Sequence, residues 1–190
     1  MSSAKPAIPA EKGVFLIASQ DMEPGIYSRS VILICEHTRA GSFGLVINKP
    51  FPTELPPEII AVEELHNPKI QYRLGGRMQQ NQMMLLHTSE ENKEQTLKVT
   101  DGIYLGGDLN FLQESLSSKE APEILLCFGY TGWISTELEH ELAAGFWYTA
   151  PANKELVFTV PPEKVWRTAL ESLGDQYKSI AMMPDDLSLN

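Results

Sequence analysis

The sequence has little cysteine, no run of basic residues and no long hydrophobic stretch. Its two cysteines, Cys35 and Cys127, each stand in an apolar run, which argues against a disulfide framework and indicates reduced core thiols. No apolar stretch approaches the ~20 residues of a membrane-spanning helix. Residues 1–12 lack the basic and then apolar pattern of a signal peptide. We therefore expect a cytoplasmic protein with no membrane partner.

Acidic residues outnumber basic ones along the chain. There are 25 Asp and Glu against 15 Lys and Arg, which gives a formal net charge of −10. Proteins bind nucleic acids largely through cations that displace phosphate counterions, so direct nucleic-acid binding is not expected. The excess charge is typical of a protein kept soluble by self-repulsion. An acidic surface for a basic protein partner is the alternative interpretation.

Familiar metal and nucleophile motifs are missing as well. The four histidines form no His-x-x-x-His motif and the cysteines form no Cys-x-x-Cys pair, so no metal site is expected. A zinc site assembled from the distant Cys35, His37 and His87 is a minor hypothesis. No serine stands in a Gly-x-Ser-x-Gly elbow, the usual setting of a hydrolase nucleophile.

Short apolar runs and turn residues indicate strands and helices in an irregular order. Strands are predicted over residues 14–18, 30–35, 45–48, 70–74, 83–87, 102–105, 123–128, 146–149 and 156–160. Helices are predicted over 57–65, over 108–116 with Asp108 as cap, after a Thr136-x-x-Glu139 capping box, and from Pro162 to Gly174. This order favours an α+β fold over a doubly wound sheet. One domain is expected over 13–177, between a disordered tail at 1–12 and a loose tail at 178–190.

Four segments, taken in order and at their spacing, carry a family pattern. They are Phe15–Ala18 with Met22 and Arg29–Val31; Cys35–His37 with Gly44–Pro50; Gly75-Gly76 with Leu86-His87; and Gly129–Trp133 with Leu138–Leu142, Trp147, Pro151-Ala152, Phe158 and Trp166. Over residues 13–175 the chain resembles the AlgH/YqgE family of uncharacterised bacterial proteins.

The resemblance implies a small closed, barrel-like and mostly antiparallel sheet that bifurcates and is flanked by helices. It implies no established catalytic activity and no cofactor, and it brings a proposed role in transcriptional regulation. The chain departs from the family pattern in several places. Arg77-Met78 stands where Pro-Val usually follows the double glycine, and Ser188–Asn190 stands where the family ends in Gly-His-Ala. A role of that terminal histidine therefore does not carry over.

Cationic and polar residues flank two of the predicted strands. If the strands around Cys35 and Val46 are antiparallel neighbours, Arg29 and Lys49 lie near one end and His37 lies at the other. Two cations at one end can hold a carboxylate or a phosphate. An ion pair of Arg29 with a neighbouring acid and a solvated Lys49 are the structural alternatives. The candidate ligand-binding residues are Arg29, Ser30, His37, Asn48 and Lys49.

Cys35 and His37 share one face of a predicted strand, because residues two apart do so. A thiolate beside an imidazole is a nucleophile, so a hydrolase that uses Cys35, His37 and Arg29 is the alternative function. Side chains that share a face are not aimed at each other, however, and Cys35 ends an apolar run as an inert core thiol does. No catalytic residue is therefore assigned. The favoured hypothesis is a non-enzymatic regulatory or interaction module for a small anionic ligand or a protein partner, in an oligomeric state left open.

Aromatic and acidic residues gather late in the chain. Tyr130–Trp133 and Trp147 are predicted to pack a helix start against the sheet, and stacking on a planar ligand is the alternative. Glu137, Glu139 and Glu141 are predicted to form a solvated face, because a helix N-terminus favours acids.

Two glycine pairs are predicted to be turns. Gly75-Gly76 and Gly106-Gly107 are both expected to need a positive φ, which glycine adopts without steric cost. Gly75-Gly76 lacks the spacing of a phosphate-binding P-loop.

Overall fold

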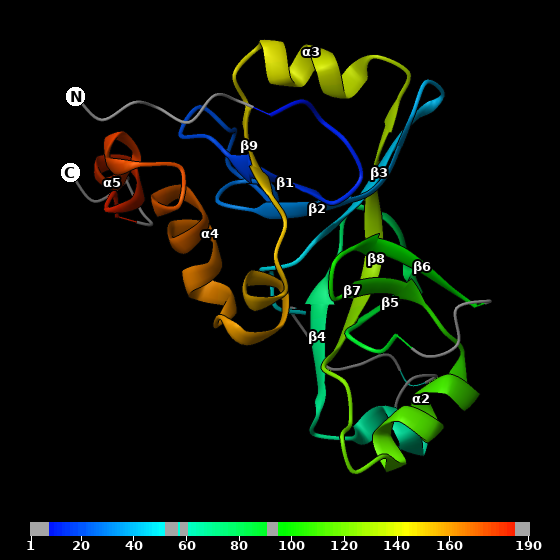
Figure 1. Cartoon of the computed structure of the whole chain (residues 1–190). Coiled ribbons are helices and arrows are strands. Elements are labelled where there is room, and N and C mark those ends of the chain that lie inside the picture. Colours follow the sequence, from blue (N-terminus) through cyan, green and yellow to red (C-terminus); the bar gives the residue numbers. More distant parts are fainter. Residues whose placement is uncertain (1–7, 52–56, 58–60, 91–94, 185–190) are drawn as a thin grey trace.

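The computed structural model describes residues 8–51, 57, 61–90 and 95–184, and it confirms the expected α+β class (Figure 1). The strands are β1 (Val14–Ala18), β2 (Val31–Thr38), β3 (Gly41–Val46), β4 (Ile70–Leu74), β5 (Met78–His87), β6 (Thr96–Thr100), β7 (Ile103–Gly106), β8 (Ile124–Ile134) and β9 (Trp147–Pro151). They form one sheet in the order β6-β7-β5-β8-β3-β2-β1-β9, and neighbours along this path are antiparallel. β4 lies off the path and pairs in parallel with β8.

Helices cover different parts of this sheet (Figure 1). They are α2 (Leu109–Ser117), α3 (Glu137–Ala143), α4 (Pro162–Glu171) and α5 (Lys178–Ala181), with the 3-10 turns η1 (Glu63–His66) and η3 (Asp175–Tyr177) and the π-helical turn η2 (Glu155–Thr159). α4 packs on β1 and β2, α3 contacts β8, β3 and β9, and α2 lies beside η1.

The sheet forks at β8. Ile124 to Phe128 pair with β4 on one side and with β5 on the other, whereas Thr131 to Ile134 pair with β3. The fork separates a large hydrophobic core around β1, β2, β3 and α4 from a smaller one between β4, β8 and α2. The bifurcated, mostly antiparallel sheet implied by the resemblance is confirmed. Its curl brings Thr100 of β6 beside Gly13, which precedes β1.

Gly75-Gly76 lies where the chain leaves β4 and crosses the backbone of β8. Neither residue has a positive φ, so the predicted reason for this pair is wrong, whereas Gly106 and Gly107 have the expected positive values of 123° and 104°. A Cβ atom on Gly76 would overlap the backbone carbonyl of Tyr130. The crossing therefore requires the absence of a side chain, not a turn conformation.

The starts of α2 and α4 are as predicted from the sequence, and that of α3 is not. The Oδ1 atom of Asp108 accepts a hydrogen bond from the Phe111 backbone N–H at 2.9 Å, so the predicted cap of α2 is confirmed. The capping box of α3 is wrong, because Thr136 has a φ of 66° and its side chain makes no cap hydrogen bond. The last predicted helix is confirmed as α4, whose buried face is formed by Val165, Trp166, Ala169 and Leu170.

Three further predictions need correction or restriction. The strand predicted over 156–160 is wrong, because Glu155–Thr159 forms η2 with Leu156, Val157 and Phe158 buried. A short continuous apolar run suits a buried helical turn as well as a strand. β6 has no counterpart among the predicted strands. The helix predicted over 57–65 lies partly outside the described residues, and its end forms η1.

The described parts of both predicted tails are tied to the domain. The backbone N–H of Ile8 donates to the Thr149 hydroxyl, and that hydroxyl donates to the Ile8 carbonyl. Residues 178–181 of the predicted loose tail form α5, which buries Ala181 completely. Residues 1–7 and 185–190 lie outside the described residues.

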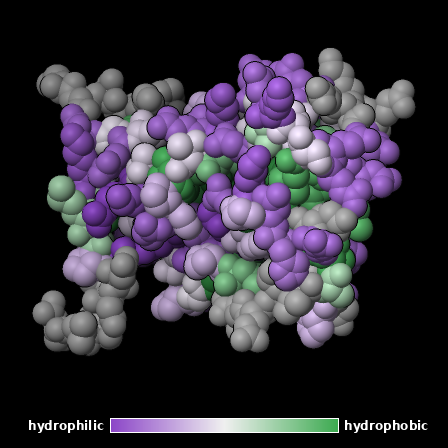
Figure 2. Space-filling model, turned by 90° about the horizontal axis from the view of Figure 1, so that it is seen from below, coloured by the Kyte–Doolittle hydropathy of each residue, from purple (hydrophilic) through white to green (hydrophobic). Residues whose placement is uncertain are grey.

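One face of the molecule is mainly hydrophilic (Figure 2), and the described helices are not long and apolar, as the composition of the chain predicts. Seen from below, the molecule presents mainly hydrophilic side chains, with hydrophobic ones in smaller areas between them (Figure 2). None of the helices in the described part of the chain combines the length and apolar character needed to cross a membrane.

Candidate functional site

β2 and β3 are antiparallel neighbours, as expected. Ile32 lies opposite Val46, and His37 lies opposite Ser42 near the tight connection between the strands. Arg29 precedes β2 and Lys49 follows β3, so these two cations lie at one end of the strand pair. His37 lies at the other end, away from both.

Arg29, Asn48 and Lys49 line one groove together with the start of α4. We call it the cationic groove; its volume is about 820 Å³. Lys164 and Arg167 of α4 line it too, and the sequence analysis did not connect them to the site. Their i, i+3 spacing places them on one face of a helix, but it does not show which strand that face meets. The described residues that line it are Pro24, Gly25, Ser28, Arg29, Asn48, Lys49, Pro50, Pro162, Glu163, Lys164, Trp166 and Arg167.

The guanidinium of Arg29 is held by α4 and by the segment after α5. It lies over the Trp166 ring, 4.8 Å from the ring centroid. It also donates to the carbonyl oxygens of Met183, at 2.8 Å, and of Pro184. Arg167 donates through Nε to the Ala181 carbonyl at 2.9 Å. Arg167 therefore satisfies a carbonyl at the end of α5, a role that cations often have at helix C-termini, and Arg29 binds carbonyls just after it.

Asn48 and Lys49 bind backbone atoms beside the groove. The Asn48 Oδ1 atom accepts from the Val31 N–H at 2.8 Å, and its Nδ2 donates to the Arg29 carbonyl at 2.9 Å. The Lys49 Nζ atom donates to the Ser28 carbonyl at 2.7 Å. Asn48 thus fixes the entry to β2, where Arg29 has a φ of 52°.

Ser30 lies behind the groove rather than on its wall. Its side chain is fully buried, and its hydroxyl has no hydrogen-bond partner among the described residues. Three of the five candidate ligand-binding residues, Arg29, Asn48 and Lys49, are therefore brought together at the groove. Ser30 and His37 are not.

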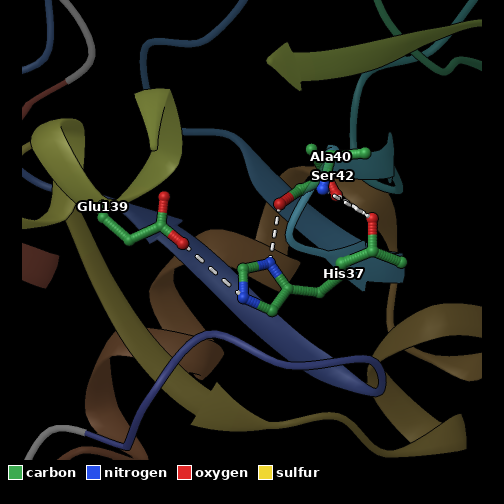
Figure 3. Close-up of polar contacts among 6 residues, drawn as sticks. His37, Ala40, Ser42 and Glu139 are labelled. Atoms are coloured by element: carbon green, nitrogen blue, oxygen red, sulfur yellow. Dashed lines mark hydrogen bonds and ion pairs between the residues drawn. The ribbon is translucent and has the colours of Figure 1, made fainter. Parts of the chain in front are cut away.

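His37 lies between β3 and α3. Its Nδ1 atom is 2.7 Å from the Ser42 hydroxyl, and its Nε2 atom is 3.6 Å from a carboxylate oxygen of Glu139 (Figure 3). Sequence analysis placed Glu139 in a capping box and a solvated acidic face, and therefore missed this contact. A serine, a histidine and a carboxylate are also the components of a hydrolytic triad. Ser42 is buried in the strand pair, however, and does not line the cationic groove. We therefore interpret the trio as a polar contact that holds β2 and β3 against α3.

Cys35 is a buried core thiol. Its side chain is inaccessible to solvent, and its Sγ atom lies 3.6 Å from the Leu33 carbonyl, to which the thiol donates. Burial raises the pKa of Cys35 far above that of a free thiol. A β-bulge interrupts the pairing with β3 at this residue. Since the His37 nitrogens face Ser42 and Glu139, the structure does not assemble the Cys35–His37 pair of the hydrolase alternative.

Family comparison agrees with the fold and the motifs. The model of the AlgH-like family matches residues 15–178. The chain belongs to the AlgH-like family. A UPF0301 protein of Chlamydia pneumoniae is 49% identical to it over 180 residues, which cover 95% of this chain and 96% of that protein. A UPF0301 protein of Chlorobium limicola is 31% identical, with 94% and 95% covered.

Solved structures show the same AlgH-like fold. The solution structure of AlgH from Pseudomonas aeruginosa matches with a TM-score of 0.70 and 28% identity, covering 96% of this chain and 99% of that one. A crystal structure of a Corynebacterium diphtheriae protein matches with a TM-score of 0.78 at 20% identity, covering 94% and 95%, which shows the fold alone. The family identified from the ordered motifs is confirmed.

The thiols of this AlgH-like protein are expected to resist alkylation in the folded state. Burial raises the pKa of both thiols, that of Cys127 to about 12, and keeps reagents away from them. Iodoacetamide at neutral to mildly alkaline pH should label neither thiol in buffer and both in urea, as mass spectrometry would show. Rapid, stoichiometric labelling of Cys35 in the folded protein near neutral pH would instead restore the nucleophile hypothesis.

His87 is buried among aromatic rings, away from Cys35 and His37. It lies against Tyr104 and Phe111, with ring centroids 5.8 Å and 4.5 Å away. In the described part of the chain, no three His, Cys, Asp or Glu side chains lie close enough to hold a metal ion. The minor hypothesis of a zinc site is therefore wrong for this trio.

His87 is expected to stay neutral far into the acid range. Burial lowers its pKa to about 4, while its Nδ1 accepts a hydrogen bond from the Ser89 N–H at 3.2 Å. Because the unfolded chain takes up this proton near pH ~6.5 and the folded chain does not, His87 disfavours folding as the pH falls from there toward 4. An NMR titration of the histidine ring protons should show one ring, absent from the spectrum of a His87→Gln variant, with a midpoint near 4. A midpoint above 6 for that ring would contradict its burial.

Proposed function

We propose that this protein is a non-enzymatic interaction module that holds a small anionic ligand in the cationic groove. The charge of the groove carries the proposal. Arg29, Lys49, Lys164 and Arg167 line it, against one carboxylate from Glu163 among the described lining residues. The whole chain has a net charge of −10, so this groove concentrates positive charge on an acidic protein. Such a site raises the local concentration of anions.

The shape and the backbone of the groove support the same ligand class. Its volume of about 820 Å³ suits a small molecule, for which pockets of roughly 300–1,000 Å³ are usual. The first turn of α4, from Pro162 to Lys164, forms part of the wall. A helix N-terminus carries partial positive charge, which adds to that of the side chains. Carboxylates and phosphates are therefore the favoured ligand groups.

The hydrolase alternative finds less support in the geometry. It needs Cys35, His37 and Arg29 in one place, but Arg29 lies in the groove, His37 contacts Ser42 and Glu139, and Cys35 is enclosed. An anionic effector bound in the groove is consistent with a regulatory role that acts through a protein partner. Such a role does not require direct contact with DNA.

Anion binding is expected to depend on Lys49 and Lys164. Pyrophosphate and citrate, titrated at low ionic strength, should shift amide resonances of residues 28–30, 48–50 and 162–167 with a dissociation constant of ~1 mM or tighter. Lys49→Met and Lys164→Met should each weaken binding roughly fivefold, because each removes one charge from the groove. Lys119→Met removes the same charge near the end of α2 and serves as the matched control.

Two results would refute the proposal. The first is the absence of saturable shifts for both anions at the groove. The second is an equal loss of affinity in Lys119→Met and in the groove variants, which would mean that only the overall charge matters.

A further inference from the structure

A second hollow, which we call the tryptophan pocket, lies on the other side of the Pro24-Gly25 turn. Its volume is about 420 Å³. Its wall comes from the loop before β2, the end of β8, α3 and the start of β9. The described lining consists of Met22, Glu23, Pro24, Gly25, Tyr27, Arg77, Thr131, Gly132, Trp133, Glu137, Glu141, Phe146 and Trp147.

A single carboxylate organises this pocket. Glu141 accepts hydrogen bonds at one oxygen from the indole N–H of Trp133, at 2.9 Å, and from that of Trp147, at 2.7 Å. Both indoles are almost completely buried. Hydrogen bonds to a carboxylate are stronger than those between neutral groups, so the acid and the two rings are held in place. The sequence predicted that Glu141 belongs to a solvated acidic face. That prediction is wrong for Glu141, because its carboxylate binds the two buried indoles.

Aromatic rings form much of the remaining wall. Tyr27 meets Trp147 edge to face, with centroids 6.4 Å apart and an angle of 75° between the rings. The Tyr27 hydroxyl accepts a hydrogen bond from Thr131 at 3.2 Å, which fixes the ring. Phe146 completes the aromatic lining. Faces of such rings attract cations through their quadrupole.

The pocket already contains one cation on an aromatic face. The guanidinium of Arg77 lies over the Tyr27 ring, 5.5 Å from its centroid. Three carboxylates, those of Glu23, Glu137 and Glu141, line the same hollow. Since the acids outnumber Arg77, the described lining carries net negative charge and has room for a further positive group.

We propose that the tryptophan pocket binds a small organic cation, a protonated or quaternary amine. Aromatic rings and carboxylates line one cavity here, and aromatic rings are the groups that recognise alkylammonium ions. An anion is disfavoured by the three acids. A metal ion is disfavoured because no group of ligating side chains among the described residues is arranged for one. This site is separate from the cationic groove and does not depend on the anion proposed there.

Choline and its neutral carbon analogue, in which carbon replaces the ammonium nitrogen, test the proposal. The indole N–H resonances of Trp133 and Trp147 should shift in a saturable way with choline, whereas that of Trp166, in the cationic groove, serves as an internal control. The neutral analogue should bind ~10-fold more weakly, since it keeps the shape and loses the charge. Lys49→Met should bind choline as the natural protein does.

Variants distinguish choline binding in the tryptophan pocket from a general effect of the negative charge of the protein. Glu23→Gln, which leaves the indole hydrogen bonds untouched, and Tyr27→Leu should each weaken choline binding roughly threefold to tenfold. Glu114→Gln on α2 removes an equal charge elsewhere and should not change it. Equal affinity for choline and its neutral analogue, unmoved Trp133 and Trp147 resonances, or an equal loss in Glu114→Gln would each overturn the proposal. Circular dichroism confirms that each variant is folded.

Discussion

Replacing Gly76 with alanine is expected to lower the free energy of unfolding by about 3 kcal/mol or more. The new methyl group would overlap the carbonyl of Tyr130, a backbone group within β8. If the obstacle were a flexible side chain, it could rotate away from the methyl group. The Tyr130 carbonyl cannot do so, because β8 is hydrogen-bonded to β5 and, at its later residues, to β3. To remove the overlap, the segment around Gly76 must move away from β8. That movement would also strain the hydrogen bond that the Val46 N–H donates to the Gly75 carbonyl, which is 2.8 Å long. Urea unfolding followed by circular dichroism would measure the loss.

Gly145→Ala is the matched control for this substitution. Gly145, unlike Gly76, has a positive φ, of 81°, but no atom lies within 4 Å of a Cβ placed there. Its replacement should cost only the backbone strain of about 1 kcal/mol. If both variants lose the same small amount, the close approach at Gly76 is not what holds the fork together.

Asn48→Ala is expected to cost about 3 kcal/mol of unfolding free energy. The amide satisfies a donor on Val31 and an acceptor on Arg29, and Asn48 is almost completely buried. Truncation leaves both backbone groups without this partner, and each unsatisfied buried group costs about 1–3 kcal/mol. The loss should appear in urea unfolding. The Asn48→Ala substitution should also weaken pyrophosphate binding, because Asn48 holds the backbone of Arg29 at the groove.

Asn67→Ala provides the comparison for Asn48. Its side chain also accepts a backbone hydrogen bond, from the Lys69 N–H at 3.0 Å, but in an exposed turn where water can replace it. A cost of less than about 1 kcal/mol is expected there. Similar losses in the two variants would show that burial of the Asn48 amide contributes little.

Much of the fold could be read from runs of apolar residues. Val14–Ala18 is buried at every position, so its continuous hydrophobic pattern predicted β1 correctly. α4 was equally clear, because its apolar residues recur with helical spacing after Pro162. The run at residues 156–160 misled, since five apolar or β-branched residues in sequence do not distinguish a strand from a buried π-helical turn. Thr136 misled because a capping box is a local pattern, whereas in the structure Thr136 has a left-handed backbone and the Glu139 carboxylate lies near His37.

Only the part of the candidate site that follows from strand pairing could be predicted from the sequence. Antiparallel pairing of β2 with β3 places Arg29 near Lys49, and this followed from two adjacent apolar strands with a short connection. The contribution of Lys164 depends on how α4 docks on the sheet, more than 100 positions along the chain. Glu141 is only eight positions from Trp133 and six from Trp147, but their contact depends on how α3 turns between β8 and β9, which the residue pattern does not show.

The place of β1 in the sheet has a consequence for synthesis on the ribosome. Val14 in this strand pairs with Pro151 of β9, which is translated roughly 10 s later at ordinary elongation rates. Until then one edge of an entirely apolar strand is unpaired, and such edges recruit other chains. During the interval before its last strand emerges, the nascent polypeptide is therefore expected to be most prone to pairing with other chains at this edge of β1.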